Sequence, residues 1–442
     1  MLRSELRNLR ENNANATNDT GLSTDEDSTR KSRDVLPVPW LESKWSFYAL
    51  PENFSLSSSP CFRSGRIYGM DVSSGAGVAV LLSDSYDRTS PSANAISKPD
   101  AEKDEKSEDL RILDLCCSPG LKLLQMADFF HNKTKRKVKV VGVDICEHRM
   151  NVCKSIVQKY FVDPDTSGRQ LINQKLPGDT NIQLYLQDGT TFGVEQLSNT
   201  ADAASTRQRG NLVFDSDVAM EEMIQRGGKR KRMNKSARAR QKKRLREIAT
   251  TESDLVRKIA ADTVESNSED NHEKRDSRHY IGLFDYVLVD AECSTDSSFK
   301  HIKERMKESS SDKQIKEVGH KEENTRLTDP GKLAELVELQ RKLLASGFRL
   351  LKDGGTLVYS TCSLSEDQNE KVVKWLLESY QDAVLVPIHF PSIMDSKFVT
   401  EGTVEGTVRF YPNLVQEVNP SSLLLGDGFF VAKIKKRSTI RE

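Results

Sequence analysis

The chain has 442 residues and a formal net charge of zero, because 66 lysines and arginines balance 66 aspartates and glutamates. Its seven cysteines form no Cys-x-x-Cys pair and no spaced Cys/His set, which argues against a zinc site and favours reduced thiols inside a cell. It contains no apolar run of about 18 residues, so we expect no membrane span.

The first stretch with an ordered composition is residues 36–82, where Trp40, Trp45 and Phe47 are grouped and residues 78–82 indicate the end of a helix or a buried strand. Beyond it, short apolar runs alternate with segments of helical spacing. The predicted strands are residues 110–115, 138–144, 182–186, 286–289, 355–359 and 428–434. The predicted helices are residues 121–130, 147–160, 333–351 and 370–380. Strands that alternate with helices predict a doubly wound, mostly parallel α/β sheet.

Four stretches are rich in charged and small polar residues and poor in apolar ones: residues 1–35, 83–109, 196–279 and 303–326. We predict that the first is a disordered tail and that the others are polar, disordered insertions. What remains suits one large domain, residues 110–434, with a small N-terminal appendage at 36–82 and a basic tail at 435–442. We expect a monomer.

Charge is strongly segregated along the chain. Residues 100–109 contain six acids and two lysines, whereas residues 226–246 contain twelve lysines or arginines and no acid. The basic block is interpreted either as a nuclear or nucleolar signal read by an import receptor, or as an arm that tracks nucleic-acid phosphates. A nuclear or nucleolar location is favoured. Mitochondrion and cytoplasm stay open, although Glu5 and Glu11 argue against a transit peptide.

Polar groups stand at the predicted ends of the first three strands, which is where ligands bind in open α/β sheets. Asp114 ends the first strand, Asp144 ends the second, and Asp188 follows the third. Asp144 is placed to accept hydrogen bonds from ribose, Asp188 to reach an adenine edge, and Lys122 to meet a carboxylate at a helix N-terminus. These features together fit S-adenosylmethionine. The alternative for each acid is that it caps its own turn.

Two cysteines, Cys293 and Cys362, each follow a short β-rich run, residues 284–290 and 356–361. Both thiols are therefore expected at the same edge of the sheet. Two thiols there suggest covalent chemistry on a small electrophilic ring. The alternative for either cysteine is a small buried apolar residue.

Three motifs carry a resemblance to a known family. Residues 114–122, D-L-C-C-S-P-G-L-K, are similar to the D-x-C-A-A-P-G-G-K motif of the Sun/Nop-type RNA cytosine-5 methyltransferases, which include the bacterial 16S rRNA methyltransferase B. Residues 290–294, D-A-E-C-S, resemble their D-A-P-C-S motif, and residues 359–363, Y-S-T-C-S, match their Y-S-T-C-S motif. Further likeness lies in residues 67–74, 337–344, 366–370 and 427–433.

The resemblance implies a Rossmann-like class I methyltransferase that acts on rRNA or tRNA. Cys362 would attack carbon 6 of the cytosine, Cys293 would release the product, and Asp290 would hydrogen-bond the ring near nitrogen 3. The target base must be unstacked to be reached. The residues implied in binding S-adenosylmethionine are Cys116, Cys117, Ser118, Pro119, Gly120, Lys122, Asp144, Asp188 and Asp290.

Two departures from the family pattern leave alternatives open. The alanines and second glycine of the cofactor motif are replaced, and Glu292 stands where the family has proline. If buried near the thiol, the Glu292 anion would raise the pKa of Cys293. It could instead bond the cytosine edge. Cations that could favour the thiolate are Lys122, Lys300 and His301. The chain could also be an inactive relative that binds RNA as a ribosome-assembly factor, or a methyltransferase acting on protein or DNA.

Overall fold

The structure is a computed structural model, and it describes a discontinuous set of residues. These are residues 36–38, 41, 47–49, 55–83, 109–130, 136–162, 180–193, 212–225, 236, 238–250, 283–298, 329–388, 399–411 and 427–438. The predictions for residues 1–35 and 303–326, for Lys300 and His301, and for most of residues 83–109 lie outside them. In the described part, no helix is both long and apolar enough to cross a membrane.

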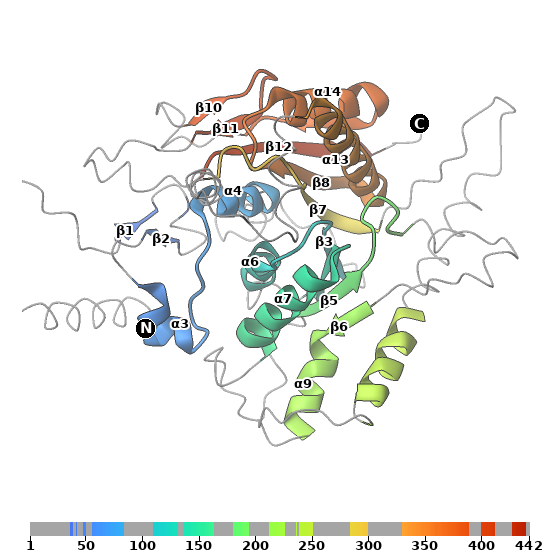
Figure 1. Cartoon of the computed structure of the whole chain (residues 1–442). Coiled ribbons are helices and arrows are strands. Elements are labelled where there is room, and N and C mark those ends of the chain that lie inside the picture. The colour runs from blue at the N-terminus through green and yellow to red at the C-terminus, as the bar shows by residue number, and fades with distance from the viewer. Residues whose placement is uncertain are drawn as a thin grey trace, which may run out of the picture.

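Within the described ranges, ten strands form one sheet, and β1 (Leu36–Pro37) pairs with β2 (Tyr48–Ala49) in a separate ribbon (Figure 1). The strands of the large sheet are β3 (Leu110–Asp114), β4 (Val138–Asp144), β5 (Thr180–Leu186), β6 (Leu212–Asp215), β7 (Phe284–Asp290), β8 (Leu351–Thr361), β9 (Ala383–Val386), β10 (Val399–Glu401), β11 (Val408–Phe410) and β12 (Phe429–Lys436). Their order is β10-β11-β12-β8-β7-β3-β4-β5-β6, and β9 also pairs with β12.

The five strands β8-β7-β3-β4-β5 run parallel, and β12 and β6 flank them antiparallel. The chain runs outward from β3 through β4 to β5, then returns to β7 and continues to β8 on the other side of β3. Strand order therefore reverses between β3 and β7, and ligands bind outside the carboxyl ends of the strands at such a switch point. The predicted doubly wound, mostly parallel sheet is confirmed.

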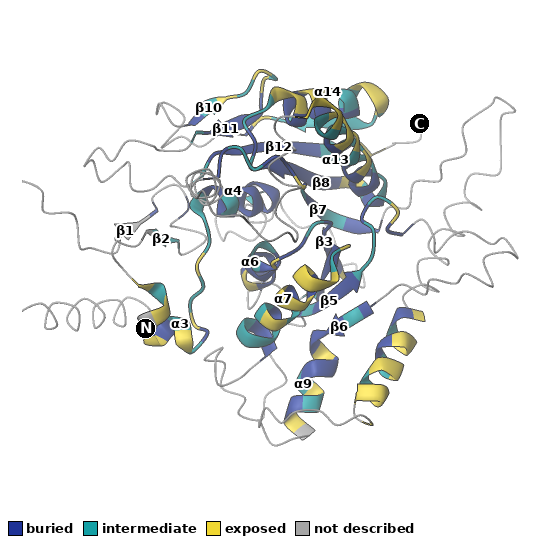
Figure 2. Cartoon of the chain, in the orientation of Figure 1, coloured by how far each residue is buried: buried dark blue, intermediate teal, exposed yellow. Residues whose placement is uncertain are grey.

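Helices cover both faces of the sheet, and the sheet between them is buried (Figure 2). On one face lie α4 (Val72–Leu81), α6 (Leu121–Phe130), α7 (Glu147–Val157) and α9 (Ser216–Gln225), and on the other lie α13 (Pro330–Leu350) and α14 (Glu370–Ser379). α4 comes from the predicted N-terminal appendage, yet Ala76, Val78 and Leu81 join the core of the sheet. A short helix, α3 (Pro60–Arg63), precedes it. Residues 78–82, for which the sequence indicated either the end of a helix or a buried strand, lie mainly in α4.

The prediction that residues 196–279 lack structure is wrong for part of that stretch. Residues 212–215 form β6, residues 216–225 form α9, and residues 238–250 form a further helix. The last helix buries Leu245 and Ala249 in the core cluster of the α13 face. A few apolar side chains at helical spacing are enough to dock it, although the surrounding composition is strongly basic.

Two smaller differences from the prediction concern where a strand ends and how far one helix side chain is buried. β12 continues to Lys436, so the predicted basic tail at 435–442 begins inside a strand. In α6, Leu124, Met126 and Phe129 are buried as expected, whereas Leu121 is only half-buried. Leu121 lies at the first position of α6, next to the edge of the sheet where two cavities open.

Candidate active site

The turn between β3 and α6 forms the floor of a cavity of about 180 Å³ at the switch point. Gly120 has a φ of +104°, and a Cβ there would lie 2.7 Å from the Cys153 Sγ atom, so the tight turn requires glycine. Arg149 of α7 donates to the Ser118 carbonyl oxygen at 2.9 Å and holds the turn in place. The cavity is lined by Met70, Asp71, Ser74, Asp114, Cys116, Cys117, Ser118, Pro119, Gly120, Leu121, Lys122 and Asp290.

Asp114 is the most strongly perturbed acid in this cavity. Burial and, to a lesser extent, the neighbouring carboxylate of Asp290 raise its pKa to about 7, although the charge of Lys122 acts in the opposite direction. Its Oδ1 atom is buried and accepts no hydrogen bond from any described residue, and the same holds for the Ser118 hydroxyl oxygen. Buried polar atoms without partners are uncommon in folded proteins, so both atoms are candidates for ligand contacts.

Lys122 and Asp290 form an ion pair across the switch point. The Lys122 Nζ atom lies 2.6 Å from Asp290 Oδ2, and the Ser360 hydroxyl donates to Asp290 Oδ1 at 2.7 Å. Burial lowers the pKa of Lys122, but the charge and hydrogen bond of Asp290 outweigh it, so the pKa is raised. Lys122 is therefore a fixed cation, and it joins the β3–α6 turn to the end of β7.

The two predicted cysteines meet at the same edge of the sheet. Cys293 follows β7 and Cys362 follows β8, and their Sγ atoms lie 2.9 Å apart as free thiols. Cys293 is buried and Cys362 is half-buried. β7 and β8 are parallel neighbours, with Asp290 opposite Ser360, so both chains leave the sheet at the same level. This register brings together two residues that are 69 positions apart.

The thiol pair cannot easily lose both protons. The hydrogen bond with Cys293 raises the pKa of Cys362 well above the ordinary value of a thiol, and burial and the charge of Asp290 act in the same direction. Lys122 is the described cation that lowers it. Cys362 therefore keeps its proton at neutral pH in this arrangement of the site.

A buried hydrogen-bond network fixes the two cysteine loops. Gln368 accepts from the Ser294 backbone N–H at 3.0 Å and donates to the Ser294 hydroxyl at 2.8 Å. Gln340 of α13 donates to the Glu292 carbonyl oxygen at 2.8 Å and to Gln368 at 3.2 Å. On the second loop, Asn369 donates to the Ser363 carbonyl oxygen at 2.8 Å. The similarity at residues 337–344 and 366–370 pointed to these segments, but not to these roles.

Glu292 is next to Cys293 in the chain but does not share its buried surroundings. Its side chain is exposed, and it is not among the groups that shift the pKa of Cys362. Its charge would act on the neighbouring thiol only if the side chain were buried close by, and it is not buried. What this position contributes to the site is its backbone carbonyl, which accepts the hydrogen bond from Gln340.

Asp144 and Asp188 lie at strand ends as predicted, but neither lines the cavity described above. Asp144 Oδ1 accepts from the Cys146 backbone N–H at 2.8 Å, and its other oxygen lies 4.0 Å from Arg149. Asp188 Oδ1 accepts from the backbone N–H of Thr190 at 2.9 Å. Both acids therefore cap their own turns, which was the alternative held open for them, and their cofactor roles remain predictions.

One acid of the site was missed from sequence. Asp71 caps α4 by accepting from the Ser73 backbone N–H at 3.0 Å, and its second oxygen accepts from the Asp427 backbone N–H at 3.1 Å. It lines the same cavity as Lys122. An aspartate before a helical run is a capping signal, but sequence alone does not say that the cap faces a cavity. In the parts of the chain that the structure describes, no three His, Cys, Asp or Glu side chains converge as metal ligands.

Part of the chain is similar to known rRNA methyltransferases. Residues 229–435 match the family model described as 16S rRNA methyltransferase RsmB/F. The match includes both cysteine strands and begins after the β3–α6 turn. Ribosomal RNA small subunit methyltransferase F of Escherichia coli O139:H28 is 33% identical over 161 residues, which cover 36% of this chain and 27% of that protein. The protein of the same name from Shigella boydii serotype 18 gives the same values. The chain thus spans about a quarter of the length of these relatives.

Solved structures give weaker likenesses. A methyltransferase homologue from Pyrococcus horikoshii covers 98% of this chain and 82% of its own, with 17% identity and a TM-score of 0.45. NSun6 from Pyrococcus horikoshii, solved with SFG, covers 88% of this chain and 59% of its own, with 16% identity and a TM-score of 0.42.

Proposed function

We propose that the chain transfers a methyl group from S-adenosylmethionine to carbon 5 of a cytosine in RNA, because residues 229–435 match the family model described as 16S rRNA methyltransferase RsmB/F. The observation that carries the proposal is the pair of thiols 2.9 Å apart at the ends of β7 and β8, beside the Asp290–Lys122 ion pair. Methylation of carbon 5 needs a nucleophile to activate the ring, and a cysteine, once ionised, suits that task.

The cavity at the switch point fits the polar end of S-adenosylmethionine. Its α-ammonium group would pair with Asp114, whose Oδ1 atom has no partner among the described residues, and its carboxylate would meet the Ser118 hydroxyl or backbone N–H groups of the turn. Asp144 and Asp188 would contact ribose and adenine through oxygens not used in capping. When bound, the cofactor supplies a methyl group on a positively charged sulfur.

The two thiols would allow the reaction to proceed in two stages, methylation of the ring and release of the product. Cys362 first gives its thiol proton to a base, and the thiolate then forms a bond to carbon 6. The electrons of the 5,6 double bond move to carbon 5, which would take the methyl group from the sulfonium and leave a neutral thioether. A base then removes the carbon 5 proton, the bond between sulfur and carbon 6 breaks, and the double bond and thiolate are restored. Cys293, within 2.9 Å, is placed to hold or return a proton during release. Asp290 would hydrogen-bond the ring near nitrogen 3.

A pair of variants tests the reaction. With labelled S-adenosylmethionine and total RNA from cells that lack the protein, Cys362→Ala should lower methyl transfer to background. Cys293→Ala should slow release and accumulate a covalent protein–RNA adduct that survives denaturing electrophoresis. The double variant should form no adduct. Cys61→Ala serves as the matched control, since Cys61 is a buried thiol of α3 outside the cavity, and it should leave transfer unchanged.

Other outcomes separate the alternatives. Absence of both adduct and RNA label would contradict the proposal and favour an RNA-binding assembly factor. Label that appears in protein or DNA would favour a methyltransferase with another substrate. Ribosomal RNA is the first substrate to test and tRNA the second. We also propose the nuclear location and the import receptor that are expected from residues 226–246.

A further inference from the structure

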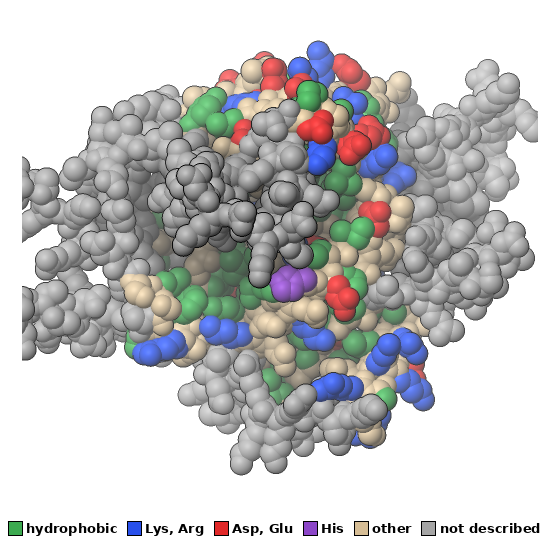
Figure 3. Space-filling view, in the orientation of Figure 1, with side chains coloured by type: hydrophobic (Ala, Val, Ile, Leu, Met, Phe, Trp, Pro, Cys, Tyr) green, Lys and Arg blue, Asp and Glu red, His purple; other side chains and the backbone are tan. Residues whose placement is uncertain are grey.

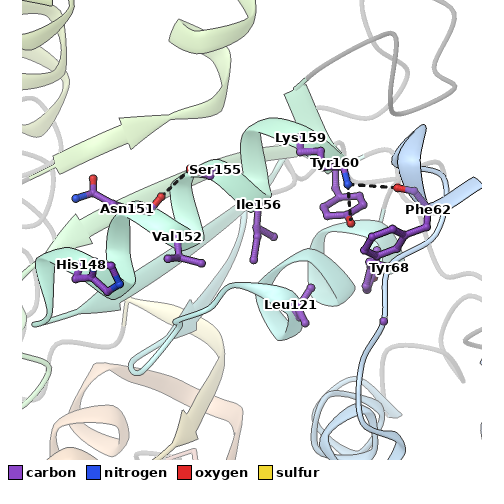
Figure 4. A pocket seen from close by; sticks show the side chains of 11 residues that line it. Phe62, Tyr68, Leu121, His148, Asn151, Val152, Ser155, Ile156, Lys159 and Tyr160 are labelled. Atoms are coloured by element: carbon purple, nitrogen blue, oxygen red, sulfur yellow. Dashed lines mark hydrogen bonds between the residues drawn. The ribbon is translucent and has the colours of Figure 1, made fainter. Parts of the chain in front are cut away.

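A second cavity, of about 600 Å³, opens along the outer face of α7. Figure 4 shows Val152 and Ile156 of α7 beside Leu121 of α6, with Phe62, Tyr68 and Tyr160 gathered at one end. Val152 is 41% exposed, which is unusual for an apolar side chain on the described surface. The volume falls in the range of about 300–1,000 Å³ that holds organic ligands. We call this cavity the α7 groove.

The aromatic end of the α7 groove is held by specific contacts. The rings of Tyr68 and Tyr160 meet edge to face, with centroids 5.6 Å apart. The Lys159 Nζ atom lies 4.6 Å from the centroids of both the Phe62 and Tyr160 rings, and the Tyr68 hydroxyl donates to Asp128 at 3.1 Å. All three rings are half-buried, so part of each remains open to the groove.

Positive charge surrounds these rings. Arg63 and Arg66 are exposed on the segment that carries Phe62 and Tyr68, and Arg149 is exposed near the other end of the groove. Glu147 is the exposed acid beside Arg149 on α7, and Asp128 is held by Tyr68. In Figure 3 a hydrophobic stretch of surface lies between the purple histidine and a group of blue side chains. An occupant of the groove should therefore combine flat apolar surface with negative charge.

The α7 groove adjoins the cavity of the candidate active site. Leu121 lines both cavities, and Gly69 of the groove is followed directly by Met70 of the active-site cavity. A strand bound along α7 would therefore lie next to the turn that lines the active-site cavity.

We propose that the α7 groove binds single-stranded RNA adjacent to the target cytosine, with bases stacked on Tyr68 and Tyr160. This inference rests on the proposed function, since it takes RNA as the substrate. Extruding a cytosine leaves its neighbours without a stacking partner. Aromatic faces beside lysine and arginine replace that stacking and neutralise phosphates, and such platforms accept bases of any sequence.

The test uses the full chain and a short fluorescent oligouridine. The double variant Tyr68→Leu, Tyr160→Leu keeps apolar volume but removes the aromatic faces, so affinity should fall about tenfold or more. The double variant Tyr68→Phe, Tyr160→Phe keeps the faces and should bind within about threefold of wild type. Trp375→Leu removes a ring paired with Arg341 on the opposite face of the sheet, and it should leave affinity unchanged.

A photocrosslink gives a second readout. An oligonucleotide carrying 4-thiouridine should crosslink to peptides containing Tyr68 or Tyr160. If the leucine variant is folded by circular dichroism and still binds as wild type, with crosslinks elsewhere, the proposal is wrong. A drop in melting temperature with unchanged RNA affinity would instead show that a segment of this chain covers the groove.

The same variants keep the two proposals apart. If wild type methylates RNA and the leucine variant does so with unchanged KM, only the groove proposal fails. If no RNA is methylated but oligouridine binding depends on Tyr68 and Tyr160, the groove proposal stands and the proposed reaction fails.

Discussion

At the scale of single residues, Asp114 is the group whose protonation the cavity controls. Burial raises its pKa to about 7, above the value in the unfolded chain. Ionising it therefore opposes folding increasingly as pH rises toward 7, and below that pH the carboxyl is largely protonated. A bound cation would reverse this preference, because it stabilises the ionised form.

This coupling predicts the pH dependence of cofactor affinity. If the α-ammonium of S-adenosylmethionine pairs with Asp114, binding must release a proton below pH 7. Affinity should then rise by up to about tenfold per pH unit between about pH 5 and pH 7, and level off above. Isothermal titration calorimetry in buffers of different ionisation enthalpy would measure both the affinity and the released proton.

The control is Asp114→Asn, which keeps the shape of the side chain and cannot ionise. It should bind more weakly at neutral pH and show no rise in affinity between about pH 5 and pH 7. The same slope in wild type and variant would show that a group other than Asp114 releases the proton.

At the scale of elements, α13 is the helix that positions the cysteine loops. It carries Gln340, and it packs against β7 through Gly347, where an added Cβ would lie 2.8 Å from the Val289 Cγ2 atom and 3.1 Å from Val287 Cγ1. The absence of a side chain at Gly347 therefore sets how closely α13 approaches the strand that ends at Asp290.

Substitution of this glycine should destabilise the fold. Gly347→Ala forces α13 away from β7, at a cost of about 1–3 kcal/mol, partly offset by the higher helix propensity of alanine, about 1 kcal/mol. We expect a net loss of up to about 2 kcal/mol in the free energy of unfolding, measured by urea denaturation with an unchanged m-value. Gly331→Ala, at an exposed position of the same helix, should leave stability unchanged or slightly raised. Equal effects of the two substitutions would contradict the packing argument.

Local patterns in the sequence predicted the central elements and missed the peripheral ones. The runs at residues 138–144 and 121–130 have a clear period, and the structure reproduces both ranges. The three-residue strands β10 and β11 lack enough residues for a period to show, and β6 is a short run inside a polar stretch. Short strands near the edge of a sheet form because neighbouring strands offer them hydrogen bonds. The sequence of the short segment alone does not reveal those neighbours.

The same limit applies to the site. Motifs located Cys293, Cys362 and Asp290, because each follows a strand in its own segment. They could not pair Lys122 with Asp290, which lies 168 positions away, since that contact depends on β3 and β7 being neighbours. For the same reason Gln340 was seen only as part of a predicted helix that resembles a segment of the family, without a role of its own.

At the scale of the whole molecule, a net charge of zero conceals a basic face. The helix at residues 238–250 is docked through Leu245 and Ala249, and it exposes Arg238, Lys242 and Arg246 at a spacing of four residues, on one side of the helix. Arg244 is tied to Glu221 of α9 at 2.7 Å. A docked helix presents these charges in fixed positions, which suits phosphate binding better than a free tail would.

We therefore propose that this helix contributes phosphate contacts, and substitution tests it better than deletion, which would expose the surface beneath Leu245. Replacing Arg238, Lys242 and Arg246 with glutamine should reduce the slope of log affinity against log salt by about 2, because each lost contact with single-stranded RNA removes about 0.7. Replacing Lys342, Lys371 and Lys374, exposed on α13 and α14, removes equal charge elsewhere and should leave the slope nearly unchanged. Equal losses in both variants would indicate a general effect of net charge, and no loss in either would remove the helix from the RNA-binding surface.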